Sequence, residues 1–298
     1  MNLNLIKRNC PSCNEISKNN PEIFPATDPI NNNEIIIKNW SGFYRNRVFF
    51  PYYRCNCGLL YNKIYLDNLS LSSLYENQKD NVIYDNLSLD LKTKKYYLNI
   101  LFDELKNKKK DIKILELGAD NGNFLNILRT ALPNSELYAI EPNKNMRQNL
   151  LKLTNNIFEN INELPDDKKF DLIVGIHVFD HIPKLNDYIN LLGKKLNING
   201  YIFGVVHNEK SILSRILKNR WPPYTLQHPH LFNHNSINNF FIRNNYKKIF
   251  IKRTKNFFYV GFLMTQLFLS LFKIKISIPK FFSIGLKLGN FSFLYKKK

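Results

Sequence analysis

The sequence predicts an α/β protein in which a doubly wound, mostly parallel sheet is joined to a small cysteine-containing N-terminal module. Three observations support this fold class. Short β-branched runs alternate with helical stretches from residue 112 onward, a turn with two glycines follows the first run, and all four cysteines lie before that region. Alternating strands and helices are typical of a parallel sheet that helices cover on both faces.

The alternation places the expected elements in order. Strands are expected at 112–118, 136–142, 170–178 and 200–208, and helices near 122–131, 143–153 and 184–196. A further helix is expected between residues 75 and 107. Its apolar positions recur at helical spacing and predict an amphipathic helix that leads into the sheet; they are Tyr97, Ile100, Leu101 and Leu105.

The chain is expected to form two domains, residues 1–74 and 75–298. The first part holds the cysteines, several prolines and the stretch FFPYYRCNCGLLYNK, a pattern typical of short strands and turns around a small core. The second part holds the sheet. A chain of 298 residues with 44% hydrophobic composition is long enough for one sizeable α/β domain and a smaller module.

The net charge of +19 at pH 7 raises the question of nucleic-acid binding. Basic residues are mostly scattered lysines with short runs at 108–110 and 296–298, and they accompany abundant Asn and Ile. This distribution favours a compositional bias and argues against a phosphate-binding surface, although an anionic substrate or a membrane surface would benefit from the same charge. No apolar secretory segment begins the sequence, which predicts a cytoplasmic location.

The stretch ELGADNG, residues 116–122, indicates a ligand site. Gly118 and Gly122 follow an expected strand, where glycine lets the backbone turn sharply and lets a ligand approach. Glu116 ends that strand, and Glu141 ends the next one, where an acid can accept both hydroxyl hydrogens of a ribose. An adenosine-containing ligand is therefore expected. A plain strand-to-helix turn with solvated acids is the simpler alternative.

At these residues the chain resembles the class I S-adenosylmethionine-dependent methyltransferases, over roughly residues 75–298. Their first motif, E/D-x-G-x-G-x-G, corresponds to Glu116, Gly118, Asp120 and Gly122, with Asp in place of the middle glycine. The resemblance implies a Rossmann-like seven-stranded sheet whose last two strands are KKIFIKRTKN and LGNFSFLYKKK, the final one antiparallel. It also implies S-adenosylmethionine as cofactor, with the methionine part held by Glu116 and the 118–122 turn.

The same resemblance implies roles for two residues further along the chain. Glu141 takes the position that binds the ribose, and Asn160, in ENINELP, takes the place of an acid that contacts the adenine amine. Two alternatives stay open. One is an NAD-dependent oxidoreductase on a similar sheet, although the G-x-G-x-x-G fingerprint is absent. The other is a catalytically inactive cofactor-binding protein, of which Asp120 and Gln227 would be signs.

The cysteines form two pairs, Cys10 and Cys13 in CPSC, and Cys55 and Cys57 in CNCG. In a cytosolic protein such pairs indicate a structural zinc site of four thiolates, while free or redox-active thiols are the alternative. The arrangement resembles the zinc-binding N-terminal module of sugar C-methyltransferases, where CPxC is followed by CxxCG and an aromatic strand. Here the second pair is one residue shorter.

Histidine suits the removal of a proton during methyl transfer near neutral pH. In GIHVFDHIP, after an expected strand, His177 is expected to line the cofactor pocket and His181 to act as a base. Sugar C-methyltransferases carry E-H-x-x-x-F after the fifth strand. That motif resembles Gln227, His228 and Phe232, and implies His228 as the base and a nucleotide-linked or glycan-bound sugar as the small-molecule acceptor. Packing or capping roles are the alternative for these histidines.

The uncharged run at 257–272 is too short for a transmembrane helix, which needs about 20 apolar residues. It is expected to lie in an insertion, residues 257–285, between the last two strands. There it would cover the substrate site or form a dimer face. Peripheral contact with anionic lipid through the flanking lysines is the alternative.

Overall fold

A seven-stranded sheet forms the centre of the protein, which is described here from a computed structural model. The structure describes residues 3–40, 48–76, 87–105, 111–272 and 282–298. The strand order is β12-β15-β10-β9-β6-β7-β8, and β15 runs antiparallel to both of its neighbours. The strands are β6 (Lys113–Leu117), β7 (Glu136–Ile140), β8 (Ile157–Phe158), β9 (Phe170–Ile176), β10 (Leu196–His207), β12 (Tyr246–Arg253) and β15 (Asn290–Lys297).

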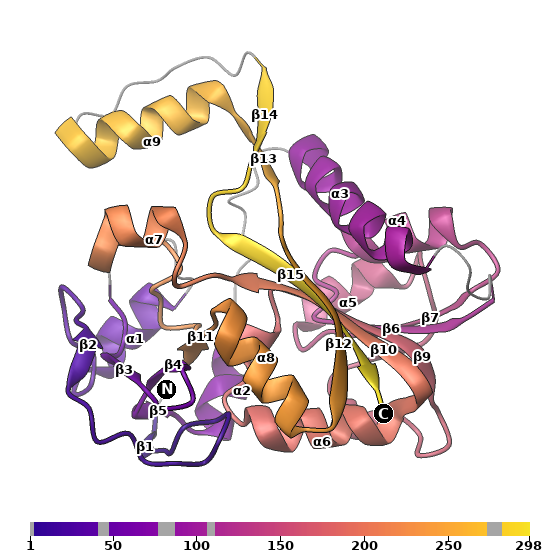
Figure 1. The fold of residues 1–298 in the computed structure, drawn as a ribbon, viewed down its shortest axis with the longest axis horizontal. Coiled ribbons are helices and arrows are strands. Elements are labelled where there is room, and N and C mark those ends of the chain that lie inside the picture. Colours follow the sequence, from indigo (N-terminus) through magenta and orange to yellow (C-terminus); the bar gives the residue numbers. More distant parts are fainter. Residues whose placement is uncertain (1–2, 41–47, 77–86, 106–110, 273–281) are drawn as a thin grey trace.

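Helices cover both faces of this sheet (Figure 1). On one face lie α3 (Leu87–Leu105), α4 (Asn123–Ala131) and α5 (Lys144–Leu150), and on the other lie α6 (Leu185–Lys195) and α8 (His234–Arg243). Alternate strand residues supply the two cores, so Ile114 packs against the first group of helices and Leu115 against the second. The doubly wound, mostly parallel fold class is therefore confirmed.

The amphipathic helix expected before the sheet is α3. Tyr97 and Leu101 are buried, as their helical spacing predicted, and they pack in the same cluster as Phe124 of α4. The helices expected near 122–131 and 184–196 begin and end within one residue of α4 and α6. Periodicity identifies such elements well because each presents one apolar face to the sheet.

The N-terminal part forms small antiparallel sheets with two short helices. Its elements are β1 (Leu5–Lys7), β2 (Pro21–Ile23), α1 (Asn33–Asn39), β3 (Tyr52–Arg54), β4 (Leu60–Asn62), β5 (Ile64–Leu66) and α2 (Asn68–Glu76). One strand of this region comes from elsewhere in the chain. β11 (His230–Leu231) pairs with β4 and completes the order β11-β4-β3-β2.

Between the last two sheet strands lies a two-stranded ribbon that carries a helix. Strands β13 (Asn256–Tyr259) and β14 (Ser283–Leu286) pair antiparallel, and α9 (Val260–Phe272) follows β13. The helix stands away from the sheet at the top of Figure 1. The apolar run thus divides into a strand segment and a helix, with Phe262 and Met264 exposed. Within the described residues, no helix is long and apolar enough to span a membrane.

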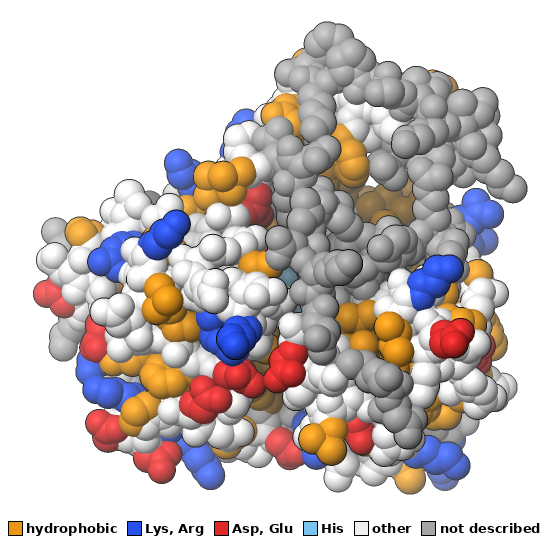
Figure 2. All heavy atoms as spheres, turned by 180° about the vertical axis from the view of Figure 1, so that it is seen from behind, with side chains coloured by type: hydrophobic (Ala, Val, Ile, Leu, Met, Phe, Trp, Pro, Cys, Tyr) orange, Lys and Arg blue, Asp and Glu red, His pale blue; other side chains and the backbone are white. Residues whose placement is uncertain are grey.

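Two short elements lie between β10 and β11, namely α7 (Ile212–Leu217) and the 3-10 helix η3 (Lys218–Arg220). On the face shown in Figure 2, the side chains of Lys and Arg are dispersed among hydrophobic and acidic ones. This dispersion agrees with the scatter of lysines along the sequence.

Candidate functional site

The turn between β6 and α4 has a left-handed backbone at three positions. Gly118, Asp120 and Gly122 have φ values of 59°, 50° and 75°. A Cβ atom on Gly118 would lie 2.8 Å from Cγ2 of Val178, so there is no room for a side chain at this position. Asp120 occupies the position of the usual middle glycine, and Asp is one of the few residues that tolerate this conformation. The substitution therefore keeps the backbone path of the turn.

Glu141 closes the turn from the neighbouring strand end. Its Oε2 accepts from the backbone N–H of Asp120 at 2.7 Å, and its Oε1 accepts from that of Asn143 at 2.9 Å. Burial raises the pKa of Glu141, and the two N–H donors act in the opposite direction. The predicted ribose acid thus lies against the glycine turn, and each of its oxygens keeps a further lone pair.

Glu116 lies at the end of β6 on the face covered by α3 and α4. The residue is buried, and its Oε2 has no hydrogen-bond partner among the described residues. Burial raises the pKa of this carboxyl to about 8, while the charge of Lys94 acts in the opposite direction. Burying a carboxyl without a hydrogen-bond partner lowers the stability of the fold, and a bound ligand can supply that partner. Glu116 is therefore suited to bind a cationic ligand group.

Asn160, the predicted adenine contact, is exposed at the start of the 3-10 helix η1 (Ile161–Glu163). Its Oδ1 accepts from the backbone N–H of Asn162 at 3.0 Å, and its Nδ2 donates to Glu163 at 2.7 Å. Both ends of the amide thus serve this cap. The adenine role of Asn160 stays a prediction.

The two histidines expected to act as bases are in contact. His181 belongs to the 3-10 helix η2 (Phe179–His181), and its Nε2 lies 3.0 Å from Nε2 of His228. The Nδ1 of His228 lies 2.6 Å from the Pro223 carbonyl oxygen, which can only accept, so Nδ1 carries the proton. His181 Nε2 then donates to His228, and His181 Nδ1 accepts from the Tyr75 hydroxyl at 3.2 Å.

A buried carboxylate lies beside this pair. Asp180 is fully buried, and its Oδ2 accepts from the backbone N–H of His207 at 3.3 Å. Its Oδ1 has no partner among the described residues. Burial alone would raise the pKa of Asp180, but four surrounding imidazoles outweigh burial and hold that pKa below its usual range.

His177 and His207 lie at the carboxyl ends of adjacent strands, and their rings stack with centroids 4.6 Å apart. His177 has a left-handed backbone with φ of 55°. Burial lowers the pKa of His177 to about 3. His207 Nδ1 lies 2.9 Å from Oδ1 of Asn290. The structure places His177 against His207, and its role in lining a cofactor pocket stays a prediction.

Tyr75, Asp180 and His207 were not assigned from the sequence. Asp180 follows the strand expected at 170–178, and His207 lies near the end of the strand expected at 200–208. Ligands of such sheets bind at the carboxyl ends of the parallel strands. That position was an available signal. Tyr75 lies in α2, 106 residues before His181, and no local pattern indicates its contact.

Comparisons with known proteins identify the family of the chain. A protein-family model described as "Methyltransferase domain" matches residues 92–249, which is more than half of the chain. The chain belongs to this methyltransferase-domain family.

Two solved structures share the fold of the methyltransferase domain. The plantazolicin methyltransferase BpumL in complex with SAH has a TM-score of 0.52 at 15% identity, over 76% of this chain and 94% of that one. The magnesium protoporphyrin IX methyltransferase ChlM from Synechocystis PCC 6803 with bound SAH has a TM-score of 0.51 at 12% identity, over 78% and 100%. A comparison with curated proteins finds no match.

The loop of the methyltransferase domain that carries His228 is held by the N-terminal region. The hydroxyls of Tyr52 and Tyr65 donate to the backbone oxygens of His228 and Leu226 at 2.6 and 2.7 Å. Both tyrosines are fully buried, and burial raises the pKa of each hydroxyl well above its usual value, so both remain donors. The N-terminal region therefore fixes the position of the His228 backbone.

An ion pair between half-buried Arg54 and buried Glu209 ties the N-terminal region to the segment after β10. The guanidinium of Arg54 contacts both carboxylate oxygens of Glu209, at 2.8 and 3.0 Å. Glu209 also accepts from Asn233 Nδ2 at 2.6 Å. Such two-point pairing fixes orientation as well as distance. Asn233 Nδ2 also donates to the carbonyl oxygen of Gly58 at 3.1 Å, so the loop from β10 to α8 is attached to the N-terminal region at both ends.

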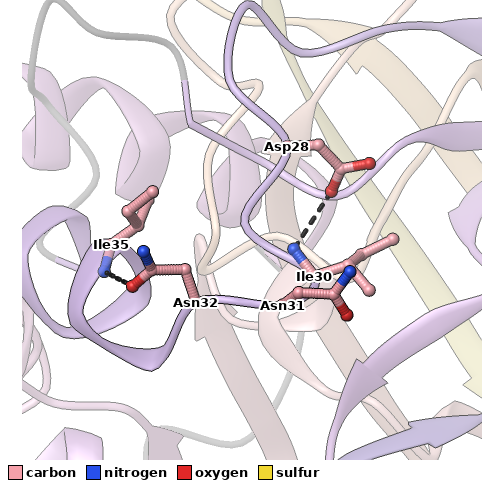
Figure 3. Close-up of a pocket in the computed structure, with 5 residues that line it drawn as sticks. All are labelled: Asp28, Ile30, Asn31, Asn32 and Ile35. Atoms are coloured by element: carbon pink, nitrogen blue, oxygen red, sulfur yellow. Dashed lines mark hydrogen bonds between the residues drawn. The ribbon is translucent and has the colours of Figure 1, made fainter.

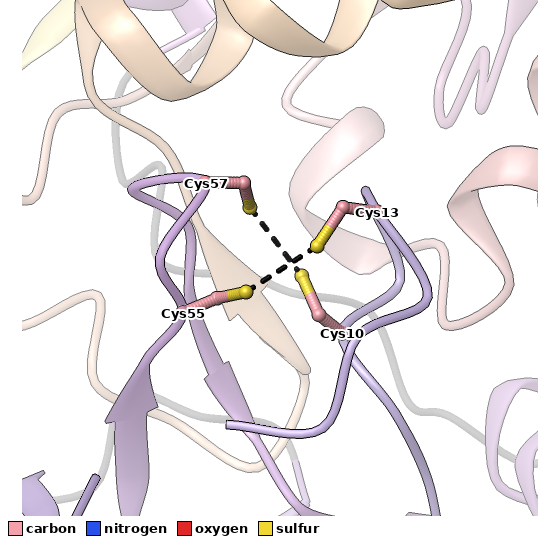
Figure 4. Close-up of side chains that lie close together, drawn as sticks. All are labelled: Cys10, Cys13, Cys55 and Cys57. Carbon is pink, nitrogen blue, oxygen red and sulfur yellow. Dashed lines mark hydrogen bonds between the residues drawn. The ribbon is translucent and has the colours of Figure 1, made fainter. Parts of the chain in front are cut away.

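The four cysteines of the N-terminal region converge on one point. Figure 4 shows their sulfur atoms pointing toward one another from two turns. Cys10 Sγ is 3.6 Å from Cys57 Sγ, Cys13 Sγ is 3.3 Å from Cys55 Sγ, and all four lie within 4.8 Å of one another. Sulfur ligands of a tetrahedral zinc ion lie about 3.8 Å apart, so this donor set fits zinc.

A surface hollow lies away from these clusters, beside α1. The side chains in Figure 3 serve local backbone turns, since Asp28 accepts from the N–H of Ile30 and Asn32 from that of Ile35, both at 3.1 Å. These contacts are Asx-type turns and a helix cap. The hollow therefore offers no catalytic group.

Proposed function

We propose that this protein transfers a methyl group from S-adenosylmethionine to a small-molecule acceptor. The observation that carries the proposal is the turn between β6 and α4, where Gly118 excludes a side chain and two buried carboxyls, Glu116 and Glu141, lie at adjacent strand ends. The residues fit the cofactor. Glu116 would pair with the ammonium of the methionine part, Glu141 would accept from the ribose hydroxyls, and Asn160 would contact the adenine.

The cofactor supplies an electrophilic methyl group on a sulfonium, and the histidine pair would supply the base. The acceptor atom loses a proton as it gains the methyl group. Burial lowers the pKa of His228 to about 4, so the ring is neutral at pH 7. The incoming proton would enter at Nδ1 of His181, which now accepts from the Tyr75 hydroxyl, and His181 would pass its Nε2 proton to Nε2 of His228 across the 3.0 Å contact.

For the acceptor, we propose a nucleotide-linked or glycan-bound sugar. Support comes from the resemblance of Gln227, His228 and Phe232 to the segment of sugar C-methyltransferases, and from the converging cysteines at the N-terminus. We propose that residues 1–74 form a module with a structural zinc ion, whose task is to hold the His228 loop. The cytoplasmic location, and cover of the site or self-association through 257–285, stay predictions.

Calorimetric titration with S-adenosylhomocysteine tests the cofactor. Micromolar binding to the wild-type protein is expected, with a loss of at least about tenfold in Glu141→Ala because hydrogen bonds to a charged group are worth about 1.5–3 kcal/mol. Glu136→Ala, at the opposite end of the same strand, is the matched control and should bind normally. Binding of NAD alone, or no binding of either ligand, would overturn the proposal.

Metal analysis after dialysis tests the module. About one equivalent of zinc per chain is expected, because structural zinc is held tightly. Less than about half an equivalent, with the four thiols all reactive, would show free cysteines instead.

A further inference from the structure

We propose that His177, Asp180 and His207 form a binding site for one divalent transition-metal ion at the carboxyl ends of β9 and β10. This site is separate from the cysteine cluster, and it lies beside the histidine pair proposed as the base. The metal site itself does not depend on the proposed function, whereas its role toward an acceptor rests on that function.

The three side chains already lie close to the spacing of metal ligands. One ligand atom from each lies within 4.8 Å of the others, and His207 Nε2 is 4.0 Å from Asp180 Oδ2. Ligand atoms around an ion with bonds of 2.0–2.2 Å lie about 3.4 Å apart. A closing movement of about 1 Å would therefore complete the contacts.

Unpartnered polar atoms point to a missing ligand. Asp180 Oδ1 and His177 Nδ1 are both buried and have no hydrogen-bond partner among the described residues. Asp180 also forms no ion pair with Lys or Arg within that part of the chain. The backbone N–H of His207 is the one hydrogen-bond donor that Asp180 has among the described residues, and a divalent cation would give its second oxygen a partner.

The hydrogen bond between Nδ1 of His207 and Asn290 orients the ring so that Nε2 can bind a metal ion. Asn290 Nδ2 donates to Asn256 Oδ1 at 3.2 Å, so Asn290 Oδ1 is the atom that faces His207 and accepts from its Nδ1. Nδ1 of His207 therefore carries a proton, and Nε2 is the ring nitrogen that faces Asp180. Metal-binding histidines are usually oriented by such a bond to their other nitrogen.

The neighbouring set of Asp180, His181 and His228 is also close enough to hold an ion. Its four imidazole nitrogens are already engaged, with Tyr75, with Pro223 and with each other. Those contacts would have to break before an ion could bind. In the first set only one long contact has to give way, because Asn290 Nδ2 donates to His177 Nε2 at 3.4 Å and so keeps the proton of a neutral His177 on Nδ1. The geometry therefore favours the first set.

Two imidazoles and one carboxylate suit zinc, nickel, cobalt or iron(II) and leave coordination positions open. An ion in that position would bind an oxygen atom of the acceptor and hold it near the base. The site is thus one for a transition metal together with an oxygen-bearing ligand.

A calorimetric titration with Ni²⁺ tests the site. It uses the full-length protein already loaded with one equivalent of zinc. One Ni²⁺ per chain is expected, and Asp180→Asn and His207→Gln should each weaken it by at least about 100-fold, since even outer-shell changes cost 10–100-fold. His234→Gln is the matched control, because His234 also has a buried unpartnered nitrogen but, among the residues that the structure describes, belongs to no group of metal-ligand side chains. It should bind Ni²⁺ normally, as should His181→Gln.

Absence of Ni²⁺ binding, or unchanged binding in Asp180→Asn and His207→Gln, would overturn the site. Loss in His181→Gln with retention in His207→Gln would place the ion on the other set and equally overturn the assignment. If the Asp180 or His207 variant fails to fold, X-ray absorption of nickel-loaded wild type and of His181→Gln decides the question. Scattering from two imidazoles in both proteins supports the site, and a sulfur ligand, a single imidazole in the wild type, or loss of one imidazole in His181→Gln contradicts it.

Discussion

The two halves of the sheet's carboxyl edge are built in different ways. At β6 and β7, the glycine turn and its two acids come from one stretch of 26 residues, from Glu116 to Glu141. At β9 and β10, the histidine cluster is assembled from α2, η2, the end of β10, the loop before β11 and the start of β15. The first half is local backbone geometry, and the second is tertiary packing of side chains.

Because of this difference, the two halves of the edge suit different tasks. A turn made from adjacent residues keeps its shape as long as its dihedral angles are allowed, so it suits a ligand that many proteins share. A cluster of distant side chains depends on every element that holds it, and it can change without disturbing the turn. Substitutions in the two halves should therefore separate cofactor affinity from turnover.

The largest effect is expected from His228→Gln, which removes the proposed base. Turnover with an acceptor found by screening sugar nucleotides should fall by about 10²–10⁴-fold, the usual contribution of general base catalysis. Affinity for S-adenosylhomocysteine should stay within about twofold, because the turn is untouched. His234→Gln should keep turnover, and a loss of cofactor affinity in His228→Gln would show that the two halves are not separable.

A smaller effect, on cofactor affinity in place of turnover, is expected from Gly118→Ala. The left-handed backbone and the 2.8 Å approach to Val178 should cost about 2 kcal/mol and weaken S-adenosylhomocysteine about 30-fold. Asp120→Gly is the companion variant, since Gly adopts the same dihedral angles with less strain. It should bind within about threefold of wild type in calorimetry. Equal loss in both variants would mean that Asp120 contacts the ligand.

The pH dependence of cofactor binding tests Glu116. Burial raises its pKa to about 8, so below that pH the free protein carries a neutral carboxyl, which must lose its proton to pair with an ammonium. Affinity should therefore rise with pH by up to about tenfold per unit and level off above pH 8. Glu116→Gln should bind more weakly with a flat profile from pH 6 to 9. A wild-type profile that is already flat contradicts this role.

The smallest effect is expected from Tyr75→Phe, which removes one hydrogen bond to His181. A neutral hydrogen bond is worth about 0.5–1.5 kcal/mol, so turnover should fall about threefold to tenfold with unchanged cofactor affinity. Tyr96→Phe, which keeps the half-buried ring that packs against Phe257, should leave the rate unchanged. A fall in thermal stability in place of the rate effect would indicate a purely structural contact.

The sequence predicted the sheet and the turn because both depend on local patterns. Helix α3 followed from its apolar spacing, and the 116–122 turn followed from its glycines. The contact between His181 and Tyr75 could not be found in this way, because it joins segments that only the fold brings together. Likewise, the apolar run at 257–272 gave no sign that its first residues pair with β14. Hydrophobicity reports burial and does not report which partner a strand chooses.

The pairing of β11 with β4 has a consequence for how the protein is made. Tyr61 of β4 is synthesised well before its partner His230, and most of the large sheet lies between them in the chain. During synthesis, the edge of the N-terminal sheet at β4 therefore stays unpaired until residue 231 has left the ribosome. The part of the chain that appears first is completed late, and contacts of such long sequence separation slow folding.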